Sequence, residues 1–248
     1  MATQFVERIA VETDGSGDDV LLIHGLGGTS NIWMPLMPTL MRHRTVRPDL
    51  PGSGRSARVE GPLSIDRYVQ AMLRICAALH VEHAHVVAHS MGTIVAFHLA
   101  NVAPQLVRSL ALFGPLLAPP DAARPGLKAR GEKARSEGEA GMQTIADGVV
   151  QGATSSETRA RQPAALAMVR ESLMRQCPDG YARSCDALVP GAKAAPRSGS
   201  FSRSPGKCRL RPESTCPGAP GRRAGRFLSR TSLPSKASAE SRRPCRRG

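Results

Sequence analysis

A serine stands where an apolar run gives way to a helical pattern. Ser90 follows the run at residues 85–88 and precedes a stretch rich in small and apolar residues. Ala88 lies two residues before it and Gly92 two residues after it. A nucleophile on a sharp strand-to-helix turn requires small residues at both positions. We therefore predict that Ser90 attacks a carbonyl carbon. The following helix would point its positive end at the site, where the N–H of Met91 would bind the developing oxyanion.

A glycine-rich segment follows an earlier apolar run and would supply the second oxyanion donor. The segment His24-Gly25-Leu26-Gly27-Gly28 comes directly after residues 20–23. Glycines would let its backbone approach the active centre, with the N–H of Leu26 as donor. Loss of one such donor typically costs about 10²–10³ in rate. The alternative is a plain glycine-rich turn in which His24 is a structural hydrogen-bonding residue.

A third turn-rich segment, Asp-Leu-Pro-Gly-Ser-Gly-Arg-Ser at residues 49–56, follows the next apolar run. Its glycines are reminiscent of a phosphate cradle. The spacing matches neither the dinucleotide-binding pattern nor the phosphate-binding loop with its lysine. We therefore interpret it as a structural turn.

The elements that must position these segments alternate along the chain. Short apolar runs separated by helical patterns are typical of βαβ units. We therefore predict an α/β fold with a mostly parallel sheet covered by helices on both faces. Strands are expected at residues 5–11, 20–24, 45–48, 85–89 and 107–113, and helices at residues 32–41, at 65–79 behind an N-cap at Ser64, and from Ser90 to about 101.

The pattern changes after residue 113, where several prolines break the chain. A polar, helix-forming stretch without a strand runs from residue 128 to 188. We interpret residues 1–114 as the N-terminal part of the core, residues 115–188 as a helical cap region, and residues 189–248 as a tail.

The formal net charge of +14 belongs to the tail. Residues 1–190 carry 19 Lys and Arg against 18 Asp and Glu, whereas residues 191–248 carry 15 against 2. The tail is rich in Arg, Ser, Pro and Gly, and we expect it to be disordered because it offers little apolar area to bury. The abrupt change near Val189 suggests a frameshift. The alternatives are a basic tail that binds polyanions by phosphate neutralisation, and an inert terminus.

Composition also bounds the class of protein. The first residues lack the apolar run of a signal peptide, and no run is long enough to span a bilayer, so a cytoplasmic protein is expected. The six cysteines lack metal-ligand spacing, and we expect free thiols and no metal. No recognised nucleic-acid module is present. The oligomeric state stays open.

The three segments, in this order and at these distances, resemble the α/β-hydrolase family over roughly residues 18–188. The resemblance implies hydrolysis of a carboxylic ester or lactone through Ser90, with Leu26 and Met91 as oxyanion donors and no metal or organic cofactor. Residues 141–147, 171–175 and 180–182 are similar to the helical cap of 3-oxoadipate enol-lactonases. That similarity implies enol-lactone hydrolysis in aromatic-compound breakdown, and a general carboxylesterase is the alternative.

Two cap arginines would meet the substrate carboxylate of an enol-lactone by the same resemblance. These are Arg135 and Arg175. The alternative for both is a solvated surface position, which is common for arginines on exposed helix faces.

The resemblance is incomplete at the catalytic triad. In the family an acid and then a histidine follow the serine along the chain, and the histidine is the general base. All seven histidines lie at or before His98, and none matches the family's terminal histidine. Loss of a triad member can cost about 10⁶ in turnover, so we expect the chain to be almost inactive. A catalytically dead remnant is the class-level alternative. Missing late strands would also leave residues 107–113 as an exposed apolar sheet edge.

Overall fold

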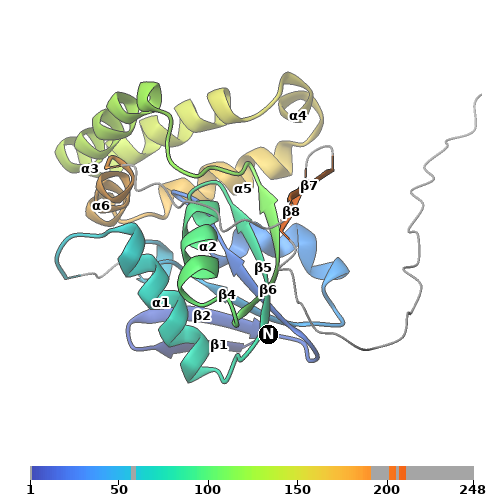
Figure 1. Ribbon diagram of the computed structural model, residues 1–248. Coiled ribbons are helices and arrows are strands. Elements are labelled where there is room, and N and C mark those ends of the chain that lie inside the picture. The colour runs from blue at the N-terminus through green and yellow to red at the C-terminus, as the bar shows by residue number, and fades with distance from the viewer. Residues whose placement is uncertain (1, 57–59, 191–200, 205–206, 211–248) are drawn as a thin grey trace, which may run out of the picture. The chain divides into compact units, whose positions relative to one another are not determined.

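A mixed β-sheet organises the computed structural model, which describes residues 2–56 and 60–190 and two short strands at 201–204 and 207–210 (Figure 1). The strand order is β1-β2-β4-β3-β5-β6-β8-β7. The neighbours β4, β3, β5 and β6 are parallel, whereas β1, β2, β8 and β7 are added antiparallel at the two edges. The strands are β1 Ala2–Val6, β2 Ile9–Asp14, β3 Asp19–Ile23, β4 Arg44–Pro48, β5 Ala84–His89, β6 Val107–Phe113, β7 Phe201–Ser204 and β8 Lys207–Leu210.

The N-terminal strand predicted at residues 5–11 is wrong, because the chain reverses within it. Val6 of β1 pairs with Ile9 of β2, so that Glu7 and Arg8 form the turn. Glu7 takes a φ of 55°, a left-handed conformation usually supplied by glycine or asparagine. The turn therefore carries no sequence signature.

The parallel strands expected at the centre of the sheet are confirmed, and β3 is buried on both faces. In β3, Leu21 and Ile23 belong to the core cluster that α1 (Ile65–Ala78) and α2 (Met91–Val102) cover. The alternate residues Val20 and Leu22 pack with Trp33 on the opposite face. This period of two divides a continuous apolar run between two helical layers.

The helices flanking the sheet follow the prediction with one exception. The Ser64 hydroxyl caps α1 by accepting the N–H of Arg67 at 3.2 Å, as expected of an N-cap. The helix predicted at residues 32–41 is instead a 3₁₀ helix, Ser30–Thr39 (η1). Pro35 and Pro38 lie inside it, and each removes an N–H that an α-helix would need.

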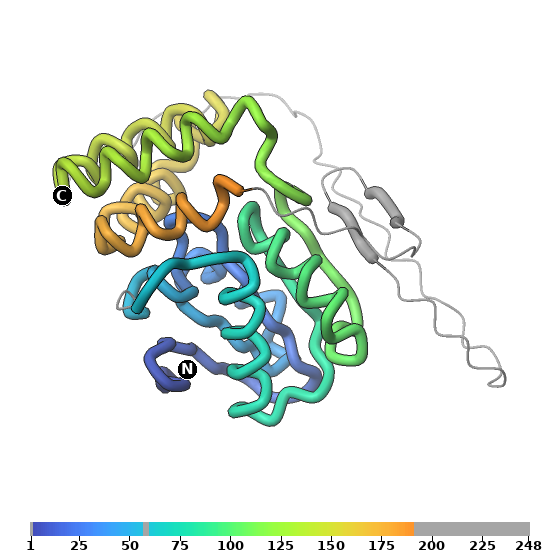
Figure 2. The backbone as a smooth tube through the Cα atoms, turned by 60° about the vertical axis from the view of Figure 1, so that its left-hand side comes forward, coloured from blue at the N-terminus to red at the C-terminus, as the bar shows by residue number. Residues whose placement is uncertain are grey.

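The segment after β6 is helical over most of residues 124–188 and contains no strand, in agreement with the strand-free stretch expected from sequence. Its helices gather around a small core of their own, which includes Met142, Leu173 and Tyr181. Figures 1 and 2 show them as a layer beyond the end of the sheet, with α3 and α6 side by side. The helices are α3 Arg124–Ala153, kinked at Gly138, α4 Ser156–Arg161, α5 Pro163–Met174 and α6 Pro178–Leu188.

The sheet edge expected to lie open along β6 is paired. Leu110, Ala111 and Leu112 pair antiparallel with residues 208–210 of β8, which forms a hairpin with β7. Strand pairing uses main-chain groups, so a segment poor in large apolar residues can still occupy an edge. The prediction that residues 189–248 are disordered is therefore wrong at residues 201–204 and 207–210, which form β7 and β8. For the rest of the tail beyond residue 190, this prediction and that of a frameshift lie outside the described residues.

Three of the cysteines are described with their side chains, and Cys76, Cys177 and Cys185 are free thiols as predicted. The other cysteine side chains lie outside the described part of the chain. In that described part, no helix is long and apolar enough to cross a membrane.

Candidate active site

Ser90 occupies the sharp turn between β5 and α2. Its φ and ψ are 50° and −119°, a conformation that costs a residue with a side chain about 1–3 kcal/mol. The Ser90 N–H donates to the carbonyl of Phe113 at 2.9 Å, and the N–H of Thr93 donates to the Ser90 carbonyl at 2.8 Å. These bonds hold the strand-turn-helix geometry that the sequence predicted.

Glycines bring the turn against the end of β3. A Cβ on Gly92 would lie 2.3 Å from the carbonyl oxygen of Ile23, and a Cβ on Gly25 would lie 3.0 Å from Cβ of Ser90. The absence of side chains at these two positions therefore lets Ser90 touch residues 24–28, which we call the oxyanion loop.

His24 fixes the orientation of the peptide between Gly25 and Leu26 in the oxyanion loop. The ring is fully buried, and its Nε2 accepts the N–H of Leu50 at 2.8 Å. The ring proton must therefore be on Nδ1, which donates to the carbonyl of Gly25 at 2.8 Å. The N–H of Gly28 donates to the same carbonyl at 3.0 Å. Because the N–H and C=O of a trans peptide point in opposite directions, the N–H of Leu26 points away from both donors.

Burial shapes the chemistry of His24 as well. Desolvation, against the hydrogen bond to Gly25 and the charge of Asp49, lowers the pKa of His24 to about 4. The imidazole is neutral at physiological pH. The structural role considered for His24 in the sequence is therefore correct, and it operates within the oxyanion loop.

Several backbone N–H groups near Ser90 have no acceptor among the described residues, and two of them are placed to matter. One is that of Leu26, and the other is that of Met91 at the first position of α2, where a helix leaves its N–H groups without intrahelical partners. They belong to the two segments that meet where Gly25 approaches Ser90. Donors left free beside a strained serine are what a developing oxyanion needs.

No imidazole among the described residues hydrogen-bonds the Ser90 hydroxyl. His24, His83 and His85 bond to other groups, namely the Gly25 carbonyl with the Leu50 N–H, the Gln105 carbonyl, and the Ser109 hydroxyl. His89 is adjacent to the serine, and burial lowers its pKa. Its Nδ1 has no partner in the described structure. Ser90 therefore lacks a described general base.

A cavity of about 240 Å³ lies between the oxyanion loop and the helices of residues 124–188. Its walls are mostly aliphatic, and the polar groups among them are those of His89, Thr154 and Ser172. The helical part of this wall cannot be predicted from the sequence, because apolar residues on a helix show that a face is buried but not which element it packs against. The lining residues are Gly25, Leu26, Gly27, Gly28, Ile32, His89, Val149, Ala153, Thr154, Met168, Val169, Ser172 and Leu173.

The two arginines predicted to bind a substrate carboxylate do not line this cavity. Arg135 forms ion pairs with Asp186 and Glu132, and Arg175 forms one with Glu171 at 2.6 Å. The Arg175 side chain is 72% exposed. Neighbouring carboxylates one helical turn away attract both side chains to the surface. The structure thus favours the solvated alternative.

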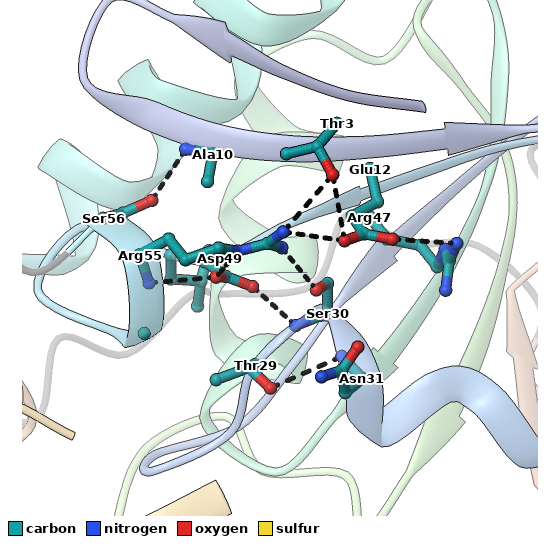
Figure 3. A network of polar contacts seen from close by, with 12 residues as sticks. Thr3, Ala10, Glu12, Thr29, Ser30, Asn31, Arg47, Asp49, Arg55 and Ser56 are labelled. Atoms are coloured by element: carbon teal, nitrogen blue, oxygen red, sulfur yellow. Dashed lines mark hydrogen bonds and ion pairs between the residues drawn. The ribbon is translucent and has the colours of Figure 1, made fainter. Parts of the chain in front are cut away.

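The turn at residues 49–56 forms a closed polar network (Figure 3). The carboxylate of Asp49 accepts the N–H of Ser30 at 2.8 Å, and it also accepts the N–H and Nε of Arg55. Arg55 also pairs with Glu12 at 2.7 Å, and Ser56 accepts the N–H of Ala10 at 2.9 Å. The polar groups of this turn are engaged with the protein itself, as expected of a structural turn. In the described structure no group of His, Cys, Asp and Glu could hold a metal ion.

Known proteins share these features. The family model described as the alpha/beta hydrolase fold matches residues 19–176, more than half of the chain. A presumptive carbamate hydrolase, RutD, of Azorhizobium caulinodans is 41% identical over 102 residues, which are 41% of this chain and 38% of that protein. A pimeloyl-[acyl-carrier protein] methyl ester esterase of Methylococcus capsulatus is 38% identical over 103 residues, 41% of this chain and 39% of the esterase.

Solved structures match over a longer stretch. The enol-lactonase of Burkholderia xenovorans LB400 superposes with a TM-score of 0.66 at 25% identity, covering 78% of this chain and 74% of that one. A hydrolase of Pseudomonas aeruginosa superposes with a TM-score of 0.67 at 26% identity, covering 74% and 69%. The chain spans 26% to 39% of the length of the curated relatives compared. Together with the sheet order and the sharp turn at Ser90 between β5 and α2, which we call the elbow, the matching family model shows that the chain belongs to the alpha/beta hydrolase fold family.

Proposed function

We propose that the chain is a serine hydrolase that acts on a carboxylic ester or lactone, with Ser90 as nucleophile. One observation carries the proposal. A serine in a strained conformation touches a loop, and backbone N–H groups on either side of the contact, those of Leu26 and Met91, have no acceptor among the described residues.

The chemistry follows from this placement. The Ser90 Oγ would attack the carbonyl carbon, and the carbonyl electron pair would move onto oxygen, where Leu26 and Met91 donate hydrogen bonds. The Ser90 proton would pass to solvent water. Collapse of the tetrahedral intermediate would break the bond to the leaving alkoxide, which takes a proton from solvent. Water would then hydrolyse the acyl-serine, which releases the acid and restores the Ser90 hydroxyl. Since no described imidazole receives the serine proton, we expect turnover about 10⁴–10⁶ below that of a complete triad.

Two substrate classes are candidates. An enol-lactone in aromatic-compound breakdown is the first, supported by the similarity to the Burkholderia enol-lactonase. A simple carboxylic ester is the second, supported by the similarity to an esterase and by the aliphatic walls of the cavity, among which Val149 and Val169 come from different helices. Both are small molecules that need no metal or organic cofactor, and both fit the cytoplasmic location expected from sequence.

A comparison of substrates in the full chain tests the proposal. p-Nitrophenyl butyrate and an enol-lactone would be assayed with the unmodified chain and with Ser90→Ala, at enzyme concentrations high enough to detect one turnover. We expect release of one equivalent of product per chain, absent in Ser90→Ala. Faster release from the enol-lactone supports the first class, and faster release from the ester supports the second. Equal release by both proteins would refute the proposal.

A further inference from the structure

The oxyanion loop is tied to the helices after β6 by a buried glutamine. Gln176 follows α5 and is only 4% exposed. Its Nε2 lies 3.3 Å from the carbonyl oxygens of both Gly27 and Gly28, and 2.7 Å from that of Ser172. Its Oε1 accepts the N–H of Gly54 at 3.2 Å. A buried amide costs free energy unless both ends are hydrogen-bonded, and here both ends are.

Ser172 and Leu173 reinforce the same attachment. The Ser172 hydroxyl donates to the carbonyl of Gly27 at 2.9 Å. A Cβ on Gly27 would lie 2.3 Å from Cδ2 of Leu173, so the last turn of α5 rests directly on the loop backbone. The carbonyls of Gly27 and Gly28 thus point at the end of α5 and at Gln176.

We propose that Gln176 and Ser172 are positioning residues that hold the oxyanion loop in the geometry needed by the N–H of Leu26. The inference rests on the proposed function of that N–H. His24 and Gly28 orient the Gly25 carbonyl from the core side, whereas Gln176 and Ser172 fix the next carbonyls from the helical side. Attachment from two sides leaves the Leu26 peptide little freedom to rotate. The position of α5 therefore determines how well the N–H of Leu26 is oriented to bind an oxyanion.

Gln176→Met tests the inference, since methionine keeps the length of the side chain and removes its hydrogen bonds. The full chain would be measured by amide hydrogen exchange of a peptide spanning residues 24–30 and by the rate at which a fluorophosphonate labels Ser90. We expect exchange in this peptide to rise about tenfold and labelling to slow by about 10-fold or more. Gln151→Met, at an exposed position on α3, is the matched control and should change neither.

Ser172→Ala and Ser172→Thr form a milder pair that loses and keeps a hydroxyl. Ser172→Ala should show part of the effect of Gln176→Met. Ser172→Thr keeps the hydroxyl and should behave like the unmodified chain. This pair decides the question if Gln176→Met does not fold. Unchanged exchange at residues 24–30 would overturn the inference, as would an equal rise in peptides from α1. If the unmodified chain is never labelled, the proposed function fails, whereas the exchange measurement still decides whether the loop is held.

Discussion

Two glycine-rich loops follow neighbouring strands of the same sheet, and their polar groups have opposite fates. In the turn at residues 49–56 the Asp49 carboxylate, the Arg55 guanidinium and the Ser56 hydroxyl bond to one another, to neighbouring side chains or to the backbone. In the oxyanion loop and the adjoining Ser90 turn, the N–H groups of Leu26 and Met91 are among those that have no acceptor in the described structure. N–H groups left free beside a strained serine are what the proposed hydrolase chemistry needs, since they can donate to a developing oxyanion. Similar glycine patterns can therefore serve stability in one place and catalysis in another.

The largest expected effect is on stability, at Asp49. Its carboxylate is 1% exposed, and Asp49→Ala would leave the N–H groups of Ser30 and Arg55 without their acceptor. We expect a loss of about 3 kcal/mol in the free energy of unfolding, measured by urea denaturation. Asp121→Ala, at a carboxylate that is 92% exposed, should have far less effect.

Ser90→Ala completes this comparison. We expect it to abolish acylation and to change stability by less than about 1 kcal/mol, because no described group bonds the hydroxyl. A large stability loss in Ser90→Ala with little change in Asp49→Ala would reverse the roles assigned to the two loops.

The buried imidazole of His24 should make the free energy of unfolding depend on pH, with an effect about as large as that of Asp49→Ala. Its pKa is about 4 in the folded chain against an ordinary value of 6.5. Because the folded pKa is depressed and the group is a base, the unfolded chain binds the proton first as pH falls. Stability is fully present above pH 6.5 and declines towards pH 4, by about 3 kcal/mol for this group.

Denaturation at several pH values between 7.5 and 4.5 would measure this decline in the unmodified chain and in His24→Asn. The variant should lose most of the slope between about pH 6.5 and 4.5. His80→Asn, at an exposed histidine, should keep it. An unchanged slope in His24→Asn would show that another group titrates.

The elbow predicts a steric effect at Gly92. Gly92→Ala would place a methyl group 2.3 Å from the Ile23 carbonyl oxygen. We expect a loss of about 1–3 kcal/mol in stability and slower labelling of Ser90, as the turn moves away from β3. Equal labelling rates in Gly92→Ala and the unmodified chain would mean that close approach is not needed.

The smallest effect is expected at Gly148, which supplies a contrast on the exposed side of α3. A Cβ there meets nothing within 4 Å. Gly148→Ala should therefore raise the free energy of unfolding by up to about 1 kcal/mol through helix propensity, with the labelling rate unchanged. Thermal denaturation would detect a gain of this size, and a loss would contradict the helical environment described for this residue.

The sequence predicts most of the parallel core because its signals there are local. The apolar runs, the small residues around Ser90 and the N-cap Ser64 each act on their own neighbours. Signals fail where structure depends on contacts far along the chain. The turn at Glu7 has no turn residue, and the pairing of β8 with β6 is made by backbone.

The candidate site likewise contains residues that the sequence predicts and residues that it does not. Ser90, Leu26 and Met91 lie on segments whose spacing is visible in the sequence, and the structure brings those segments together. Gln176 was not identified, because a glutamine after a helix usually faces solvent, and only the approach of α5 to Gly27 buries it. Arg135 and Arg175 were misplaced because a charge on a helix does not reveal which side it faces.

Covalent labelling of the full chain with a fluorophosphonate, followed by peptide mapping, tests the central claim most directly. The account predicts one adduct, on the peptide that contains Ser90, formed in the unmodified chain and absent from Ser90→Ala. Denatured protein should not be labelled, because the oxyanion loop and the elbow are then apart. Labelling elsewhere, or equal labelling of Ser90→Ala, would contradict the assignment of Ser90 as a nucleophile.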